Sequence, residues 1–355
     1  MAKKIFFAVM NWGLGHASRS IPIIKKLQQR GIELIVGSDG VALALLQKEF
    51  PTLQFVELPA YNVHYRSNNM ILNIAPQVPK LIYAINKERR YIKNIISTQQ
   101  IDAIISDNRF GIFDSRVYAV FITHQLNILI PNPLIAKWVN HKNANYIRRY
   151  HQCWVPDYSG AKAIAPALSA HNGFNHLRYI GPVSRMQTQT CSKEYDITVV
   201  LSGVEPQRSY LEKAIIEQLK NSSYRVVIVS GNTLADRQVS IEDNIERIPY
   251  LCTKELNALM LSSRLLICRS GYSSIMDIHK LGIQKVLFIP TPGQTEQEYL
   301  AEQLSGTAQF RYQKQVQLDL LETVAELLEE PVQVQKPKDA DPLLDQAIDD
   351  LLSNI

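Results

Sequence analysis

The chain has 355 residues, of which 46% are hydrophobic and 20% charged, as in ordinary globular proteins. This composition excludes wholesale disorder and fibrous architecture, and the length predicts two or three domains. The net charge of +5 conceals two unequal parts: residues 1–185 contain 22 Lys and Arg against 9 Asp and Glu, whereas residues 186–355 contain 16 against 24.

Short apolar runs alternate with longer amphipathic stretches along the chain. The first part predicts a strand at 5–10, a helix at 20–30, a strand at 33–37, a helix at 41–50, and strands at 53–57, 103–106 and 117–123. The second part predicts strands at 197–202, 225–230, 265–268 and 285–289, with helices at 209–221, 253–262 and 273–281. Such alternation is typical of parallel sheets with helices on both faces, and two series indicate two doubly wound domains.

The predicted domain boundary lies where Gly181-Pro182-Val183 leads into the polar segment 187–193. We therefore expect an N-terminal domain over residues 1–185 and a C-terminal domain over 186–335. Residues 336–355 read as a polar linker and an acidic amphipathic helix, which could pack on either domain.

Several protein classes are disfavoured. The four cysteines are scattered, so we expect neither a zinc site nor a disulfide framework, and a reducing compartment is the default. The apolar run at 5–10 is too short for a signal peptide. No run approaches the roughly 18 apolar residues of a transmembrane helix, so we expect a cytoplasmic protein.

A glycine-rich turn, Gly13-Leu14-Gly15-His16, directly follows the first predicted strand. Glycine lets a loop approach a ligand closely, and the start of the next helix offers free N–H groups. The turn is not a dinucleotide fingerprint, because Ser18 occupies the place of the third glycine. A tight structural turn is an equal interpretation, but His16 at the mouth of a parallel sheet favours a ligand site.

Two further loops follow strands in the second part. One contains Ser202-Gly203 with Arg208 close behind it, and the other is Cys268-Arg269-Ser270-Gly271, which opens the helix that carries Asp277. Small and hydroxylated residues at a helix start, flanked by arginine, suit a diphosphate. Asp277 could accept hydrogen bonds from two vicinal hydroxyls, or it could simply stabilise the helix start.

Together these motifs resemble the glycosyltransferase 28 family, whose best-known members are the peptidoglycan UDP-N-acetylglucosamine transferases. The matching residues are, in order, 13–16 with Arg19, then His124-Gln125-Leu126-Asn127, Gly181-Pro182-Val183, and Cys268-Arg269-Ser270-Gly271 with Asp277, Gly282, Pro290 and Gln297. The sequence departs from the family in having Asp277 where Glu is usual, and its loop at 201–208 lacks the usual glycine richness. These departures argue against the peptidoglycan enzyme itself and leave sugar and nucleotide open.

The resemblance implies an α/β protein with the GT-B fold, in which two facing Rossmann-like domains enclose a cleft. It implies a metal-independent, inverting transfer of a sugar from a nucleotide donor, expected to be a UDP-sugar, to an acceptor hydroxyl, with no cofactor besides this co-substrate. His16 is the expected general base, and its ordinary pKa suits that task. The expected donor-binding residues are Ser202, Gly203, Arg208, Arg269, Ser270, Gly271, Tyr272, Ser273, Asp277, Gln297 and Glu298, with the backbone around Tyr250-Leu251 at the base; the acceptor-binding residues are Gly13, Gly15, Arg19, His124 and Asn127.

Two other functions stay open at this stage. A nucleotide-sugar hydrolase or epimerase would use the same cleft with an acidic base, for which Asp107 is the obvious candidate. A non-catalytic subunit that binds nucleotide sugars is the other, although the presence of both His16 and the donor loop argues against it.

The basic residues of the first part concentrate at 80–93 and 137–149, where they interleave with apolar side chains. Two helices with apolar core faces and solvated basic backs would give this pattern. A peripheral surface that docks on anionic lipid would also give it, and would suit a lipid-linked acceptor at the inner face of a membrane. Nucleic acid is disfavoured because no nucleic-acid-binding motif accompanies the charge.

Overall fold

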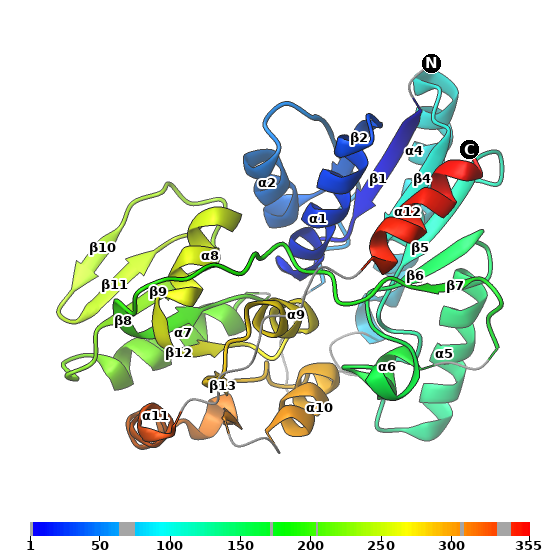
Figure 1. Ribbon diagram of the computed structural model, residues 1–355. Helices are drawn as coiled ribbons and strands as arrows, with labels where there is room; N and C mark the ends of the chain where they lie inside the picture. Colours follow the sequence, from blue (N-terminus) through cyan, green and yellow to red (C-terminus); the bar gives the residue numbers. More distant parts are fainter. Residues whose placement is uncertain (1–2, 64–74, 171–172, 204, 306–308, 332–341) are drawn as a thin grey trace.

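Both series of predicted strands form mostly parallel sheets with helices on their two faces (Figure 1). The computed structural model describes residues 3–63, 75–170, 173–203, 205–305, 309–331 and 342–355. The first sheet has the strand order β3-β2-β1-β4-β5-β6-β7, and its neighbouring strands are parallel. Its strands are β1 (Lys4–Val9), β2 (Glu33–Ser38), β3 (Gln54–Glu57), β4 (Ala103–Asp107), β5 (Tyr118–Ile122), β6 (Gln152–Val155) and β7 (Leu177–Tyr179).

The second sheet has the order β10-β11-β9-β8-β12-β13-β14 and is parallel except for the antiparallel edge pair β10 and β11. Its strands are β8 (Tyr195–Val200), β9 (Val226–Val229), β10 (Ser240–Glu242), β11 (Ile245–Ile248), β12 (Ser263–Cys268), β13 (Val286–Phe288) and β14 (Phe310–Tyr312). The prediction of an α/β protein with two doubly wound domains is confirmed. Strands β6, β7, β10, β11 and β14 were not predicted, because they are short and lack a long apolar run.

The helices divide between the faces of each sheet. On the first sheet, α1 (Gly15–Gln29), α2 (Gly40–Glu49) and α12 (Leu343–Ser353) cover one face, and α4 (Val78–Gln99) and α5 (Pro133–Ile147) the other. On the second sheet, α8 (Thr253–Leu261), α9 (Tyr272–Leu281) and α10 (Thr295–Leu304) lie opposite α7 (Gln207–Leu219) and α11 (Leu320–Glu329). The short α6 (Pro166–Ser169) adds Leu168 to the core of the second domain.

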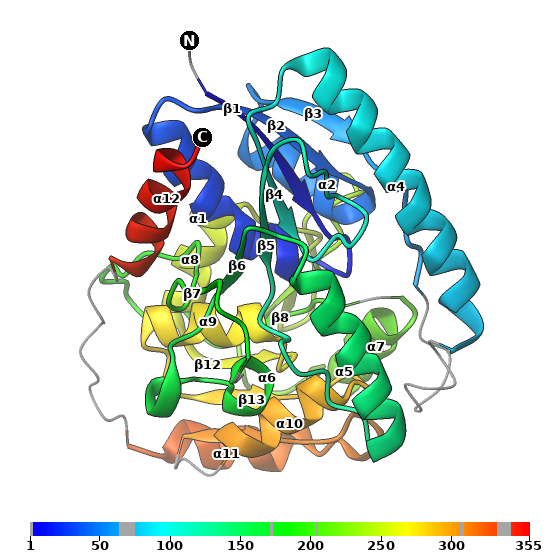
Figure 2. The same ribbon diagram turned by 90° about the vertical axis from the view of Figure 1, so that its right-hand side faces the viewer.

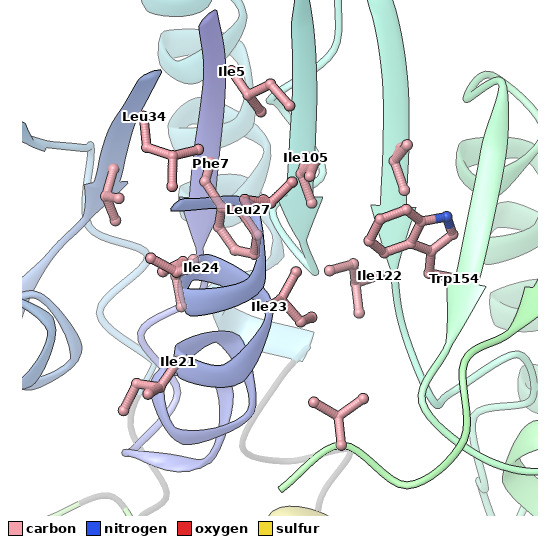
Figure 3. Packing of buried hydrophobic residues seen from close by; sticks show 14 of the residues in the cluster. Ile5, Phe7, Ile21, Ile23, Ile24, Leu27, Leu34, Ile105, Ile122 and Trp154 are labelled. Carbon is pink, nitrogen blue, oxygen red and sulfur yellow. The ribbon is translucent and has the colours of Figure 1, made fainter. Parts of the chain in front are cut away.

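The alternation of side chains along β1 explains why this strand is apolar throughout. Ile5 and Phe7 enter the core under α1, as Figure 3 shows, whereas Phe6 and Ala8 enter the core under α4. A strand buried on both faces reads as a continuous apolar run, which is why residues 5–10 resemble the start of a signal peptide. The strand ends at the sheet's carboxyl edge, and the glycine turn begins there.

Helix α1 begins at Gly15, five residues before the predicted start. The glycine turn therefore passes directly into the helix, and His16 and Arg19 lie on its first two turns. This correction matters for the chemistry, because residues three apart on a helix are neighbours on one face.

Helix α12 packs on the N-terminal domain, which settles the alternative that the sequence left open (Figure 2). Its apolar face, which includes Ile348, joins the core around β1 and α1. Its acidic face pairs with basic side chains of α1, since Asp345 lies 2.6 Å from Lys26 and 2.8 Å from Arg30. The end of the chain thus returns from the second domain to the first.

Candidate active site

A cleft lies between the two domains, where the carboxyl ends of both sheets face each other. The loops after β1, β4 and β5 line it from the first domain, and the loops after β8, β12 and β13 line it from the second. Open α/β sheets bind ligands at this edge. Of the predicted site residues, the cleft is lined by Gly13, Gly15, His16, Arg19, His124, Ser202, Gly203, Gly271, Tyr272, Ser273 and Gln297.

The glycines of the first turn let the two domains approach closely. A Cβ on Gly13, whose φ is +75°, would lie 3.4 Å from Cα of Gly203. A Cβ on Gly15 would lie 3.3 Å from Oγ of Ser273, which donates a hydrogen bond to the Gly15 carbonyl at 2.8 Å. The two glycine loops that the sequence singles out therefore meet across the cleft.

His16 is held by Asp107, the last residue of β4. The distance from Nδ1 of His16 to Oδ1 of Asp107 is 2.9 Å, and the Asp107 side chain is fully buried. Arg19 and Ser20 also donate to Asp107, with Arg19 Nε at 2.9 Å and Ser20 Oγ at 3.0 Å from Oδ2. Asp107 therefore accepts hydrogen bonds from three side chains, and its contact with Nδ1 fixes the orientation of the His16 ring.

The electrostatics leave His16 neutral and Asp107 ionised. Burial of Asp107 opposes its ionisation, but the positive charge of Arg19 and the contact with His16 outweigh it and hold its pKa well below the usual range. Burial, together with Arg19, lowers the pKa of His16. The ionised Asp107 accepts a hydrogen bond from the N–H at Nδ1 of His16, so we assign the lone pair of the ring to Nε2, as a general base requires. Nη2 of Arg19 lies 2.8 Å from the same Nδ1 but also contacts Oδ1 of Asp107, so its proton has an acceptor.

A chain of polar contacts continues from Arg19 across the cleft. Nη1 of Arg19 lies 2.7 Å from Nδ1 of His124, and Nε2 of His124 lies 3.0 Å from Oε1 of Glu296 on α10. The His124 ring also stacks on Tyr272, with centroids 4.1 Å apart. Because Arg19 donates to Nδ1, His124 carries its proton on Nε2 and donates it to Glu296. The burial of Glu296 opposes its ionisation, but His124 outweighs that effect and the pKa of Glu296 is lowered.

A second hollow adjoins the cleft and contains Asp277 and the Tyr250-Leu251 loop. Ser202 and Ser273 line both spaces, so the two hollows share one wall. Ser184 Oγ donates to Oδ1 of Asp277 at 2.6 Å. Burial raises the pKa of Asp277 to about 6, against the opposing effects of Arg185 and Ser184.

Five predicted site residues lie outside these two hollows. The buried guanidinium of Arg269 donates to the carbonyls of Ile289, Pro290 and Gln207, and burial lowers its pKa to about 9. Arg208 pairs with Glu205 and Glu212 and donates to the Ser230 carbonyl. Ser270, Asn127 and Glu298 complete this group: Ser270 donates to the Gln297 carbonyl, Asn127 to the Ala170 carbonyl, and Glu298 is exposed.

Two residues that face the hollows were not predicted. Glu296 points into the cleft where Glu298 was expected, because the turns of α10 place residues 296 and 298 on different sides. Arg185, two residues after Val183 of the Gly-Pro-Val stretch, lines the hollow of Asp277 and is 9% exposed. Within the described part of the chain its Nε has no hydrogen-bond partner. Its position close to the boundary motif is the sequence feature that could have identified Arg185 as a site residue.

The described residues contain neither a metal-binding cluster nor a membrane-spanning helix. Across residues 3–63, 75–170, 173–203, 205–305, 309–331 and 342–355, no group of three His, Cys, Asp or Glu side chains is arranged to hold a metal ion. In the same part of the chain, no helix has the length and apolarity needed to cross a bilayer.

The comparisons with known proteins agree with this geometry. Residues 200–351 match the sequence profile of the glycosyltransferase family 28 C-terminal domain, and no curated protein matches the chain. The glycotransferase of kitacinnamycin is similar in structure, with a TM-score of 0.63, 14% identity, and coverage of 93% of this chain and 92% of that one. MurG from Acinetobacter baumannii has a TM-score of 0.52, 15% identity, and coverage of 92% and 90%.

A putative UDP-N-acetylglucosamine 2-epimerase from Listeria monocytogenes shares the fold as well, with a TM-score of 0.56, 10% identity, and coverage of 100% and 96%. At such identities these structures establish the fold alone, which is GT-B as the resemblance implied. The family assignment depends on the sequence match and confirms the expectation drawn from the motifs. The C-terminal domain of this chain belongs to glycosyltransferase family 28, and the protein is a glycosyltransferase with the GT-B fold.

Proposed function

We propose that the protein transfers a sugar from a UDP-sugar to an acceptor hydroxyl, with inversion and without a metal ion. The observation that carries the proposal is the His16–Asp107 pair at the cleft. A neutral histidine, oriented by a buried carboxylate, removes the acceptor proton while the hydroxyl oxygen attacks the anomeric carbon. The bond to the diphosphate oxygen breaks on the opposite face, and UDP leaves with the electron pair.

The departing diphosphate needs positive potential, and two helix starts would supply it. Helices α1 and α9 contact each other at the cleft, and their first residues, Gly15 and Tyr272, line it. Neither helix has an acidic residue in its first turn, and among the described residues neither start receives a side-chain capping bond. Free N–H groups at two helix starts form an anion site. We therefore assign the diphosphate to these helix starts and not to Arg208 and Arg269, because the guanidinium groups of both arginines bind backbone carbonyls of the protein.

Residues that line the two hollows would bind the other parts of the nucleotide sugar. Asp277 would accept hydrogen bonds from the ribose hydroxyls, and the free Nε of Arg185 would donate to the nucleotide in the same hollow. Glu296 and Gln297, at the start of α10, would contact the hydroxyls of the donor sugar. Gln297 is positioned by the N–H of Thr291, which donates to its Oε1 at 2.8 Å.

The hydrolase and epimerase alternative required Asp107 as a base. Asp107 is fully buried beneath His16 and accepts hydrogen bonds from three side chains, so it is not free to contact a substrate. This arrangement favours the transferase.

Replacement of His16 by Ala tests the proposal. We expect loss of acceptor-dependent UDP release with little change in UDP affinity, measured by a coupled release assay and by calorimetry. Near-wild-type turnover would show that His16 is not the base. UDP release by the wild type that does not depend on an acceptor would instead indicate a hydrolase, and binding without release would indicate a non-catalytic subunit.

We also propose that the acceptor is lipid-linked and that the N-terminal domain docks on an anionic membrane. The support is that α4 and α5 expose large apolar side chains next to basic ones: Tyr83 is 70%, Leu134 79% and Trp138 62% exposed. These side chains lie on the outer faces, opposite the buried positions of their helices, so core packing does not account for them. Apolar side chains interleaved with cations are typical of interfacial binding.

Flotation with vesicles of phosphatidylcholine and phosphatidylglycerol tests this second proposal. We expect salt-sensitive binding that falls when Tyr83 and Trp138 are replaced by Ala. Tyr210, which is 57% exposed on α7 of the other domain, provides the matched control substitution. Binding that is absent, or that falls equally with Tyr210→Ala, would contradict membrane docking through α4 and α5.

A further inference from the structure

The hollow assigned to the donor nucleotide is closed by a helix of the opposite domain. Leu45 of α2, which belongs to the N-terminal domain, lines it together with Arg185, Tyr250 and Asp277. The end of α2 then carries two charged residues, Lys48 and Glu49, that contact the second domain directly. A nucleotide in this hollow would therefore touch surfaces built by both domains.

Glu49 caps a helix of the other domain. Its Oε1 accepts hydrogen bonds from the backbone N–H of Thr253, at 2.5 Å, and from the Thr253 hydroxyl, at 2.6 Å. Thr253 is the first residue of α8, whose N–H groups lack partners within the helix. A carboxylate at this position satisfies one of them and interacts favourably with the helix dipole. Because residues 250–252 immediately precede α8, Glu49 also fixes the loop that faces the base.

Glu49 also holds Arg185 in place. Nη1 of Arg185 lies 3.6 Å from Oε1 of Glu49 and 3.4 Å from the Thr253 hydroxyl, and both charged side chains are more than nine-tenths buried. Nη1 is occupied in this way, whereas Nε of the same side chain, which lines the hollow of Asp277, has no hydrogen-bond partner among the described residues. Removal of Glu49 would take away the carboxylate that pairs with this guanidinium and leave it free to turn toward Asp277, whose pKa Arg185 already lowers.

Lys48 also connects α2 to the loops of the second domain that border the hollow. Its ammonium donates to the Thr233 carbonyl at 2.6 Å and lies 3.5 Å from the centre of the Tyr250 ring. Thr233 in turn donates to the Val41 carbonyl at the other end of α2, at 2.9 Å. The loops after β9 and β11, which border the hollow, are thus both tied to α2.

We propose that Glu49 and Lys48 of the acceptor domain are positioning residues of the donor-nucleotide site, acting through Arg185 and the loop at 250–253. The proposal rests on the proposed function, because it takes this hollow as the UDP site. Its consequence is that donor affinity depends on a domain that does not itself carry the donor motifs. Pre-organised groups bind more tightly than groups that must be ordered on binding.

Calorimetric titration of UDP into the intact protein tests the proposal. We expect Glu49→Gln to weaken UDP binding about tenfold and Lys48→Met about threefold, with the KM for the donor rising and kcat at saturating donor unchanged. Glu217→Gln and Lys213→Met, an exposed pair on α7, are the matched controls and should bind UDP as the wild type does. Thermal unfolding of each variant checks the fold.

A double-mutant cycle separates positioning from general destabilisation. The Gln side chain keeps an oxygen that can accept from Thr253 but lacks the charge that pairs with Arg185, so the double variant Glu49→Gln/Arg185→Gln should bind UDP within about twofold of Arg185→Gln alone. Additive losses, or a Glu49→Gln variant that binds UDP as tightly as wild type, would overturn the inference while leaving the proposed function intact. Failure of wild-type protein to bind UDP, with dTDP, GDP and ADP as comparisons, would overturn the proposed function and the inference with it.

Discussion

Replacement of Asp107 by Asn is the sharpest test of the proposed mechanism, because it changes one atom beneath the base. Arg19 Nε and Ser20 Oγ both donate to Oδ2, whereas Oδ1 contacts Arg19 Nη2 and also His16 Nδ1, which becomes an acceptor when its proton moves to Nε2, so we place the amide oxygen at the Oδ2 position. The amide NH2 then takes the position of Oδ1, 2.9 Å from Nδ1 of His16. It donates to that nitrogen and forces the imidazole proton onto Nε2. The histidine thereby loses the lone pair that faces the acceptor.

The magnitude follows from the charge that the substitution removes. In the transition state His16 gains a proton, and the ionised Asp107 stabilises the resulting imidazolium. Two unit charges about 4 Å apart interact by about 4 kcal/mol at an effective dielectric constant of about 20. Since each 1.36 kcal/mol is about tenfold in rate, kcat should fall roughly a thousandfold. The uncompensated charge of Arg19 would lower the pKa of His16 further and adds to the loss.

The assay is acceptor-dependent UDP release at saturating donor, combined with UDP titration. We expect UDP affinity to change little, because Asp107 is fully buried and lines neither hollow. Ser20→Ala is the matched control, since it removes one bond to Asp107 without altering the contact with His16, and its kcat should stay within tenfold of wild type. If Asp107→Asn binds UDP normally and keeps kcat within tenfold of wild type, the reasoning is refuted.

Three other predictions follow from the geometry. Because burial raises the pKa of Asp277 to about 6, UDP binding should weaken as the pH falls through about 6 and the carboxylate protonates. The terminal phosphate of UDP titrates in the same range, so the pH profile of UDP binding to Asp277→Asn provides the baseline. Equal pH profiles for the wild type and this variant would contradict a role of Asp277 in UDP binding. Ile348→Asp should destabilise the N-terminal domain by about 3 kcal/mol or more in urea unfolding, because it buries a charge in the core, whereas the exposed Asp349→Asn should cost less than about 1 kcal/mol. Gly15→Ala should lower kcat about tenfold by pressing on Ser273 Oγ, and adding Ser273→Ala should restore most of it; no recovery would mean that the contact is not the cause.

The fold was predictable because its signals are local. Long apolar runs such as that of β1 mark strands buried on both faces, and the glycine turns after β1 and β12 mark the carboxyl edges of two sheets. The site was predictable only as far as such turns determine it. His16 and Ser273 line one cleft because each is the second residue of a helix that follows a central strand.

What could not be predicted depends on contacts between distant residues. Asp107 contacts a histidine 91 positions away, and only the parallel pairing of β1 with β4 places the two side by side. Arg269 lies inside the donor motif, yet its side chain turns into the protein and binds carbonyls, because a side chain's direction is set by packing. Glu296 and Glu298 differ by two residues, so the exact start of α10 decides which of them reaches the cleft.

The contacts of the N-terminal domain show where its surplus of basic side chains lies. The domain with the basic surplus also receives α12, whose aspartates neutralise Lys26 and Arg30 on α1, so that face is not where the surplus acts. Arg19 and Arg109 are buried against carboxylates, which removes them from the surface as well. Among the residues that the structure describes, the cations of α4 and α5 form no ion pair with a carboxylate, and they lie outside the cleft and next to exposed apolar side chains. In the proposed function, the helix starts would bind the donor diphosphate, Arg185 would bind the nucleotide in the hollow of Asp277, and the basic surface would hold the enzyme against an anionic membrane.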